Sequence, residues 1–112
     1  MPILKADYSI IDYEKMAESI GLKAKHIPIL LESFLEETLL ILGSLQLSID
    51  EMDYEKIESY AHAVKGSAGN LRFNEVCEMA GEMEKSAAKK STDFDYKLYF
   101  DAINSALETI SL

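Results

Sequence analysis

The sequence predicts an all-α protein, an up-down antiparallel four-helix bundle with a short additional N-terminal helix. Glycine and proline together number only seven residues, while leucine, alanine, glutamate, lysine and methionine are abundant, which favours helix over sheet. Apolar residues recur every three or four positions, and no alternating strand pattern of useful length is found. A chain of 112 residues can bury a single core, so residues 1–112 are expected to form one domain.

The short N-terminal helix is predicted over about residues 11–20. Asp12 is a suitable N-cap because its carboxylate can accept a hydrogen bond from the first turn, and Gly21 is a suitable C-terminal stop. The turns that follow each helix are only a few residues long. Helices joined by such turns pack as antiparallel neighbours, which is the basis for predicting a bundle.

The second helix is predicted to be the longest, over about residues 25–48. Pro28 is tolerated because it falls in the first turn, where its missing N–H is not needed. Leu39, Leu40 and Ile41 lie off the main apolar stripe, which predicts burial of this helix on more than one side. The main stripe consists of Ile27, Leu30, Leu31, Phe34, Leu35, Leu42 and Leu45.

Three further helices complete the predicted bundle. Residues 48–51 form a turn, and Asp53 caps a third helix over about residues 54–71. A fourth runs over about residues 74–90, and a fifth continues from a cap at 91–93 to the end of the chain. The predicted inner residues are Val76, Cys77, Ala80, Met83 and Ala87 on the fourth helix and Tyr99, Ile103, Ala106, Leu107 and Ile110 on the fifth.

Composition and charge exclude several classes of function. The net charge of −9 opposes binding to nucleic acid or to an anionic membrane. The single cysteine, Cys77, allows no internal disulfide, and it is predicted to be an inert core residue. No apolar run reaches the ~20 residues of a membrane span, and no signal peptide begins the chain, so a cytoplasmic protein is expected. An acidic surface without a sustained heptad seam predicts a monomer.

The third helix contains two glycines that destabilise it and an outward-facing histidine. Gly66 and Gly69 together cost about 2 kcal/mol relative to alanine. On a helical wheel His62 lies well away from the core stripe, and both glycines and Lys65 lie near His62. Two interpretations are open at this point: an ordinary surface histidine with unrelated glycines, or a bare backbone that lets a partner or a phosphoryl group reach the imidazole. The core stripe of this helix is Ile57, Ala61, Val64, Ala68 and Leu71.

The same segment, HAVKGSAGNL at residues 62–71, resembles the signature of histidine-containing phosphotransfer (HPt) domains. These helical bundles carry a phosphoryl group between receiver domains in two-component phosphorelays. The stretch at residues 34–37 is similar to the F-L-x-E of the family. The later family pattern, L-x-x-L-A-x-x-L-E, is matched in order by Val76, Met79, Ala80, Met83 and Glu84. The resemblance covers most of the chain.

The resemblance implies a carrier of phosphoryl groups, not an enzyme that acts alone. His62 would take a phosphoryl group from the phospho-aspartate of a receiver domain or from a kinase and pass it to another receiver. Lys65 would stabilise the phosphate, and Gly66 and Gly69 would admit the receiver. Phosphorylation at Nδ1 or at Nε2 is open, and the exposed position favours the outer Nε2. No cofactor or metal is expected in this chain, because any Mg²⁺ belongs to the acidic pocket of the receiver.

The surface around the histidine is the expected docking site for receiver domains or a hybrid sensor histidine kinase. Ser67 belongs to it together with the two glycines, and Phe73 continues the same line if the helix runs that far. Arg72 stands where the family has glycine, and two consequences are open. The turn into the next helix is altered, or the arginine supplies a second cation to the phosphate or the partner.

Other functions are weighed against this one. A module that docks a receiver or kinase without phosphotransfer is the main alternative, and an excised domain of a larger sensor kinase is a third. His26 has no lysine-glycine pattern after it and is predicted to be a surface residue. A metal site made of His62 with Glu55 and Glu58 is disfavoured, because the spacing differs from that of di-iron bundles.

Overall fold

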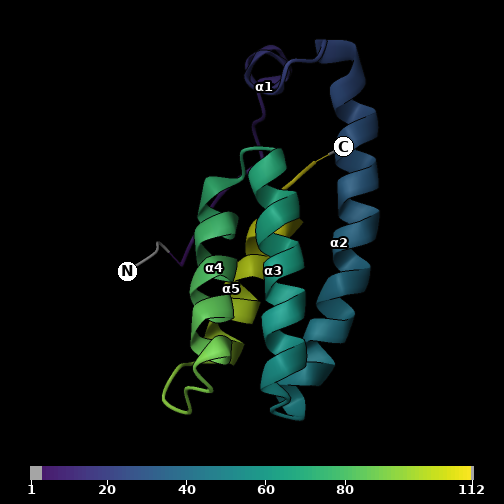
Figure 1. The fold of residues 1–112 in the computed structure, drawn as a ribbon. Coiled ribbons are helices and arrows are strands. Elements are labelled where there is room, and N and C mark those ends of the chain that lie inside the picture. Colours follow the sequence, from purple (N-terminus) through teal and green to yellow (C-terminus); the bar gives the residue numbers. More distant parts are fainter. Residues whose placement is uncertain (1–3, 112) are drawn as a thin grey trace.

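In the computed structural model, which describes residues 4–111, the chain is a bundle of four long helices with a short helix near one end (Figure 1). The four helices run alternately up and down, and the described residues contain no β-strand. The fold class predicted from the sequence is therefore confirmed. The elements are α1 (Tyr13–Ile20), a 3₁₀ turn (Ala24–His26), α2 (Ile27–Asp50), α3 (Tyr54–Asn70), α4 (Asn74–Ala88) and α5 (Tyr96–Glu108).

The caps predicted for α1 and α3 are confirmed, because short polar side chains satisfy the first free backbone N–H groups of each helix. Asp12 accepts a hydrogen bond from the backbone of Lys15, and Asp53 accepts one from the backbone of Lys56. Gly21 ends α1 in the left-handed conformation, at φ 75°, which glycine adopts without strain.

Several helix ends differ from the prediction. The helix α2 continues to Asp50, and the chain turns at Met52, whose φ is 51°. The helix α4 stops at Ala88, two residues early. The helix α5 begins after Asp95, whose carboxylate accepts a hydrogen bond from Leu98, so the predicted cap at residues 91–93 is wrong. Several acidic or hydroxyl residues stand in each connection, and any of them can cap a helix locally.

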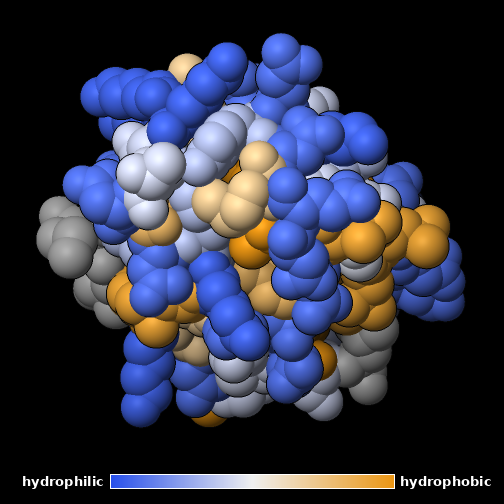
Figure 2. All heavy atoms as spheres, turned by 90° about the horizontal axis from the view of Figure 1, so that it is seen from below, coloured by the Kyte–Doolittle hydropathy of each residue, from blue (hydrophilic) through white to orange (hydrophobic). Residues whose placement is uncertain are grey.

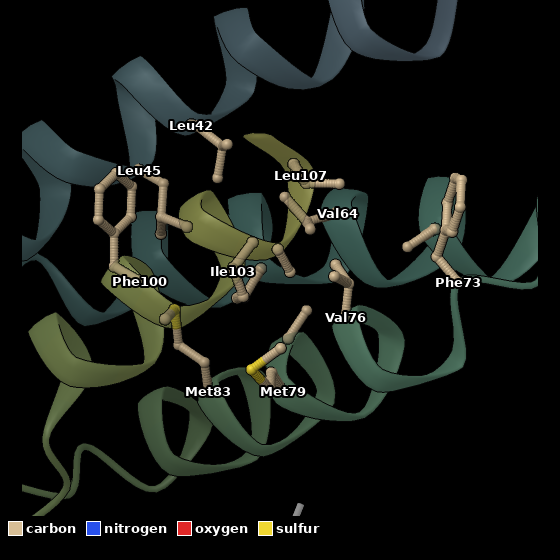
Figure 3. Close-up of a cluster of buried hydrophobic side chains, with 14 of the residues drawn as sticks. Leu42, Leu45, Val64, Phe73, Val76, Met79, Met83, Phe100, Ile103 and Leu107 are labelled. Atoms are coloured by element: carbon tan, nitrogen blue, oxygen red, sulfur yellow. The ribbon is translucent and has the colours of Figure 1, made fainter. Parts of the chain in front are cut away.

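The core lies between α2, α3, α4 and α5, whose apolar side chains point toward one another (Figure 3). All five residues of the predicted α3 stripe and all five of the α5 stripe are buried. Two predictions of burial are wrong. Leu39 and Leu40 are 56% and 77% exposed, so α2 is buried on one side only. Cys77 is half-buried, at the edge of the contact between α3 and α4.

The segment before α1 is held against the bundle by Tyr8. Its backbone N–H donates a hydrogen bond to Oγ1 of Thr109, and its hydroxyl donates one to the carboxylate of Glu75 at 2.9 Å. The Tyr8 ring also packs against Phe73, with a centroid separation of 4.5 Å. Burial, followed by the hydrogen bond to Glu75, raises the pKa of the Tyr8 hydroxyl. None of the described helices is long and apolar enough to cross a membrane.

Candidate functional site

His62 lies near the middle of α3 on the side that faces away from the core, as its position in the sequence predicts. Its side chain is 67% exposed, while the neighbouring core residues Ala61 and Val64 are fully buried. The ring does not stand free in solvent. Its Nδ1 lies 2.7 Å from a carboxylate oxygen of Glu84, which projects from α4.

Glu84 also binds Lys65, so one carboxylate connects the two residues of α3. Nζ of Lys65 lies 2.6 Å from Oε1 of Glu84, and Nδ1 of His62 lies at the other oxygen, Oε2. Lys65 follows His62 by three residues, which places both on the same side of α3. The result is a His62–Glu84–Lys65 triad that spans the contact between two helices.

The charge state of Glu84 determines which nitrogen of His62 can react. Partial burial raises the pKa of the Glu84 carboxyl, but hydrogen bonds from Lys65 and His62 outweigh this effect, and the net pKa is lowered. Glu84 is therefore ionised at neutral pH and can only accept hydrogen bonds. Nδ1 of His62 must then carry the proton of this contact, and the lone pair of a neutral ring lies on Nε2.

Three glycines near His62 differ in what surrounds them. A Cβ atom at Gly66 would meet no heavy atom within 4 Å, so Gly66 leaves open space beside the histidine. A Cβ at Gly69 would lie 3.4 Å from Sγ of Cys77, which places Gly69 at the contact between α3 and α4. A Cβ at Gly81 would lie 3.4 Å from Cδ of Lys65, so Gly81 gives room for the lysine side chain to lie across α4.

Ser67 is half-buried and borders a shallow hollow between α2 and α3. The hollow begins one turn beyond His62 and is lined by polar and apolar side chains from both helices. Its lining residues are Leu30, Ser33, Phe34, Glu37, Ser67, Asn70 and Leu71. Ser67 therefore lies on the side of α3 that faces α2, whereas Gly66, four residues after His62, is exposed beside the imidazole.

Phe73 does not lie on this surface, and its prediction as a docking residue is wrong. The helix α3 ends at Asn70, so the line of His62, Gly66 and Gly69 does not continue to residue 73. Phe73 is 2% exposed and packs against Phe34 with a centroid separation of 5.3 Å. The aromatic ring belongs to the core, as Figure 3 shows at one end of the cluster.

Arg72 forms the turn between α3 and α4 in the conformation that glycine normally supplies. Its φ is 64°, and the backbone N–H of Phe73 donates to the carbonyl of Ala68, as in a Schellman C-cap. The guanidinium donates hydrogen bonds to the side chain and carbonyl of Ser19 and to the carbonyl of Gly69. The helical turn is therefore kept, and Arg72 fastens the end of α1 to it.

A role for Arg72 as a second cation at the phosphate is wrong. It lies ten residues after His62, which corresponds to about 15 Å along a helix axis, and its side chain reaches away toward α1. Whether it contacts a partner stays a prediction.

His26 is exposed in the 3₁₀ turn, as predicted. Within residues 4–111, no group of three or more His, Cys, Asp or Glu side chains is placed to hold a metal ion.

Glu84 and Gly81 are the site residues that the sequence did not predict. Helical spacing relates residues on one helix, whereas the contact between His62 and Glu84 spans 22 residues and depends on how α3 and α4 pack. One signal for Glu84 is present in the sequence. It is the glutamate at the end of the later family pattern, a charged residue directly after inward-facing residues of the same helix.

Comparison with protein families identifies the family to which this helical bundle belongs. A search of curated proteins and a search of solved structures each found no significant match. The family model of the Hpt domain matches residues 29–110, which comprise α2 after its first residues and all of α3, α4 and α5. A match over most of the chain, on a helical bundle that presents a histidine from its third helix, shows that the chain belongs to the Hpt domain family.

Proposed function

We propose that this protein is a phosphorelay intermediate in which His62 accepts a phosphoryl group and passes it to a receiver domain. Hpt domains have a histidine phosphotransfer role in phosphorelays, and membership of the family supports that role here. The observation that carries the assignment to His62 is its contact with Glu84. Because the Glu84 carboxylate accepts a hydrogen bond from Nδ1, it favours the tautomer with the proton on Nδ1 and leaves Nε2 as the nucleophilic nitrogen of an exposed ring.

In the proposed reaction, the lone pair of Nε2 attacks the phosphorus of a phospho-aspartate on a docked receiver. The new N–P bond forms as the bond between phosphorus and the aspartate oxygen breaks, and the aspartate leaves as a carboxylate with the electron pair. The proton on Nδ1 stays in place, so the ring becomes positively charged. Glu84 stabilises that charge because its carboxylate lies 2.7 Å from Nδ1.

Lys65 is the cation proposed to receive the phosphoryl group. Its ammonium is held at Glu84, three residues along α3 from the reacting histidine. A flexible lysine stem allows Nζ to turn from the carboxylate toward the arriving phosphoryl oxygens, which carry more negative charge than Glu84. Gly66 and Ser67 provide the adjoining surface on which the receiver would rest.

The partners proposed for this reaction are receiver domains and the receiver of a hybrid sensor histidine kinase. A receiver would bring the Mg²⁺ that neutralises the phosphoryl oxygens in the transition state. The direction of transfer depends on which receiver is phosphorylated, because each step is a reversible exchange between the acyl phosphate of a receiver aspartate and the phosphoimidazole of His62.

The test is intact mass spectrometry after mixing the protein with a panel of phosphorylated receiver domains and Mg²⁺. Wild type should gain the mass of one phosphoryl group, and the adduct should be lost after acid treatment, because phosphohistidine is labile in acid. His62→Gln should gain none, while His26→Gln, in which the exposed histidine outside the site is changed, should behave as wild type.

An adduct that persists in His62→Gln would refute the assignment of the site. Binding of a receiver without any adduct would instead favour the alternative, a docking module that acts without phosphotransfer.

A further inference from the structure

The helix α2 contains a long stretch without charge in a protein that is otherwise rich in acidic residues. Residues 38–49 include no Asp, Glu, Lys or Arg, although such residues make up 28% of the chain. The stretch covers three helical turns, or about 18 Å along the helix axis. Four acidic residues flank it within α2, namely Glu32, Glu36, Glu37 and Asp50, and α2 contains no basic residue.

Five of the twelve residues of this uncharged stretch are exposed to solvent. Leu39, Leu40 and Leu47 are 56%, 77% and 59% exposed, and Gly43 between them is exposed as well. We call these four residues the outer face of α2. On a helical wheel, Leu40 and Leu47 lie opposite the buried residues Leu31 and Leu45. Figure 2 shows hydrophobic side chains gathered at the right-hand edge of the molecule, on the side where α2 lies in Figure 1.

Nothing in the described bundle covers this face, and its glycine makes it suited to close packing. A Cβ atom at Gly43 would meet no heavy atom within 4 Å, so a partner helix could approach the backbone of α2 there. Exposed leucines at positions 40 and 47 are seven residues apart, which places them two turns apart on one line. A cluster of apolar side chains rimmed by charge is typical of a surface that binds another protein.

Charge identifies the kind of partner. In an antiparallel pair of α2 helices centred on Gly43, Glu36 of one copy would meet Asp50 of the other, and in a parallel pair Glu36 would meet Glu36. Both arrangements set like charges together at the ends of the apolar contact, between molecules that each carry a net charge of −9. A second copy of this chain is therefore a poor occupant. A partner with basic residues at the ends of its apolar stripe would be attracted at both ends.

We propose that the outer face of α2 is a docking surface for an amphipathic helix of another protein. The partner helix carries an apolar stripe of about three turns with lysine or arginine at each end. This surface is separate from the residues that react in phosphotransfer. His62, Lys65 and Glu84 lie on α3 and α4, and the hollow at Ser67 opens on the side of α2 that faces α3. Binding of such a helix to α2 would hold this protein close to other proteins of its phosphorelay.

The test uses a fluorescent designed peptide of about 18 residues, with leucines on one helical face and lysines at both ends. Fluorescence anisotropy should detect binding to wild type, with a dissociation constant at least tenfold weaker for Leu40→Gln/Leu47→Gln. Both leucines are exposed, so this variant should keep the circular dichroism spectrum of wild type. Leu98→Gln removes a leucine that is 49% exposed from α5 and should bind as wild type.

Two further measurements decide the charge argument. A peptide with glutamates in place of the terminal lysines should bind at least tenfold more weakly, and raising the salt concentration should weaken only the lysine peptide. Equal binding by wild type and Leu40→Gln/Leu47→Gln would refute the docking surface. A wild-type dimer in analytical ultracentrifugation that the same variant dissociates would also refute it, because the face would then be an interface between two copies. These readouts measure binding, so loss of phosphotransfer at His62 would not affect them.

Discussion

Replacing Gly66 separates the stability of α3 from the accessibility of His62. Glycine in a helix interior is less favourable than alanine by about 1 kcal/mol, and leucine is nearly as good as alanine. Because a Cβ at residue 66 meets no atom within 4 Å, Gly66→Ala creates no clash inside the domain, and at this exposed position the longer side chain of Gly66→Leu can extend into solvent. Both variants should therefore be more stable than wild type. For a chain of 112 residues, 1 kcal/mol raises Tm by about 4 °C.

Phosphotransfer should respond to the two variants very differently. Gly66 lies one turn beyond His62, on the surface over which the receiver is proposed to approach. A leucine there would hold the receiver away from Nε2, and a misplacement of about 1 Å can reduce a rate on the order of 100-fold. We expect the rate of transfer from a phosphorylated receiver to fall at least tenfold in Gly66→Leu. The smaller methyl group of Gly66→Ala should reduce it much less.

Gly43 provides a matched control for the effect of helix propensity. It is also an exposed glycine in a helix interior with open space around its Cα, but it lies on α2. Gly43→Leu should raise Tm by a similar amount and leave the rate of transfer unchanged. Thermal unfolding by circular dichroism and phosphotransfer by rapid-quench assay measure the two quantities. A normal transfer rate in Gly66→Leu would refute the argument that the glycine gives access to His62.

Three other predictions follow from named contacts. Glu84→Ala removes the hydrogen bond acceptor of Nδ1 and should slow acceptance of phosphate about tenfold, which corresponds to ~1.4 kcal/mol, near the lower end for a hydrogen bond to a charged group. Glu84→Gln should slow it less, because its amide oxygen can still accept from Nδ1. A full rate in Glu84→Ala would contradict this role. Because the pKa of Tyr8 is raised in the folded state, the unfolded chain loses its tyrosine proton first as the pH rises above about 10, and the contribution of Tyr8 to stability is then lost. The stability advantage of wild type over Tyr8→Phe in urea unfolding should therefore shrink at alkaline pH. An advantage that grows there would contradict the raised pKa. In the same urea assay Arg72→Gly should be more stable than Arg72→Ala by about 1 kcal/mol. Both variants lose the contacts with Ser19, but only glycine adopts φ 64° without strain. Equal urea midpoints of unfolding for the two variants would show that the turn is not strained.

The bundle could be predicted from the sequence because the helices have regular apolar stripes, which are buried when the helices pack against one another. The stripes of α3 and α5 were correct at every residue. Helix ends were less accurate where the connection offers several capping residues, as at residues 91–95, because Asp93 and Asp95 are equally good caps by composition. The structure selects Asp95 because its carboxylate can reach the backbone N–H of Leu98.

Two errors concern apolar residues whose exposure depends on how the helices pack. Leu39 and Leu40 are apolar but lie where no other helix packs, and a sequence cannot show which faces of a long helix have neighbours. On a helical wheel Phe73 continues the line of Gly66 and Gly69, which predicts a surface position. The wheel ceases to apply once α3 ends at Asn70, and the turn at Arg72 directs the ring into the core.

In the proposed reaction, the geometry of the candidate site gives Lys65 a role beside His62 in a protein of such acidic character. Before transfer, the single negative charge of Glu84 is balanced by Lys65 at 2.6 Å. In the proposed reaction a phosphoryl group with further negative charge arrives, while the ring of His62 becomes positive. Glu84 can then remain with the ring at Nδ1, and Lys65 is released to pair with the phosphoryl oxygens. Under this proposal one carboxylate acts in both states: it holds Lys65 beside the unphosphorylated His62, and it balances the positive charge of the phosphorylated ring.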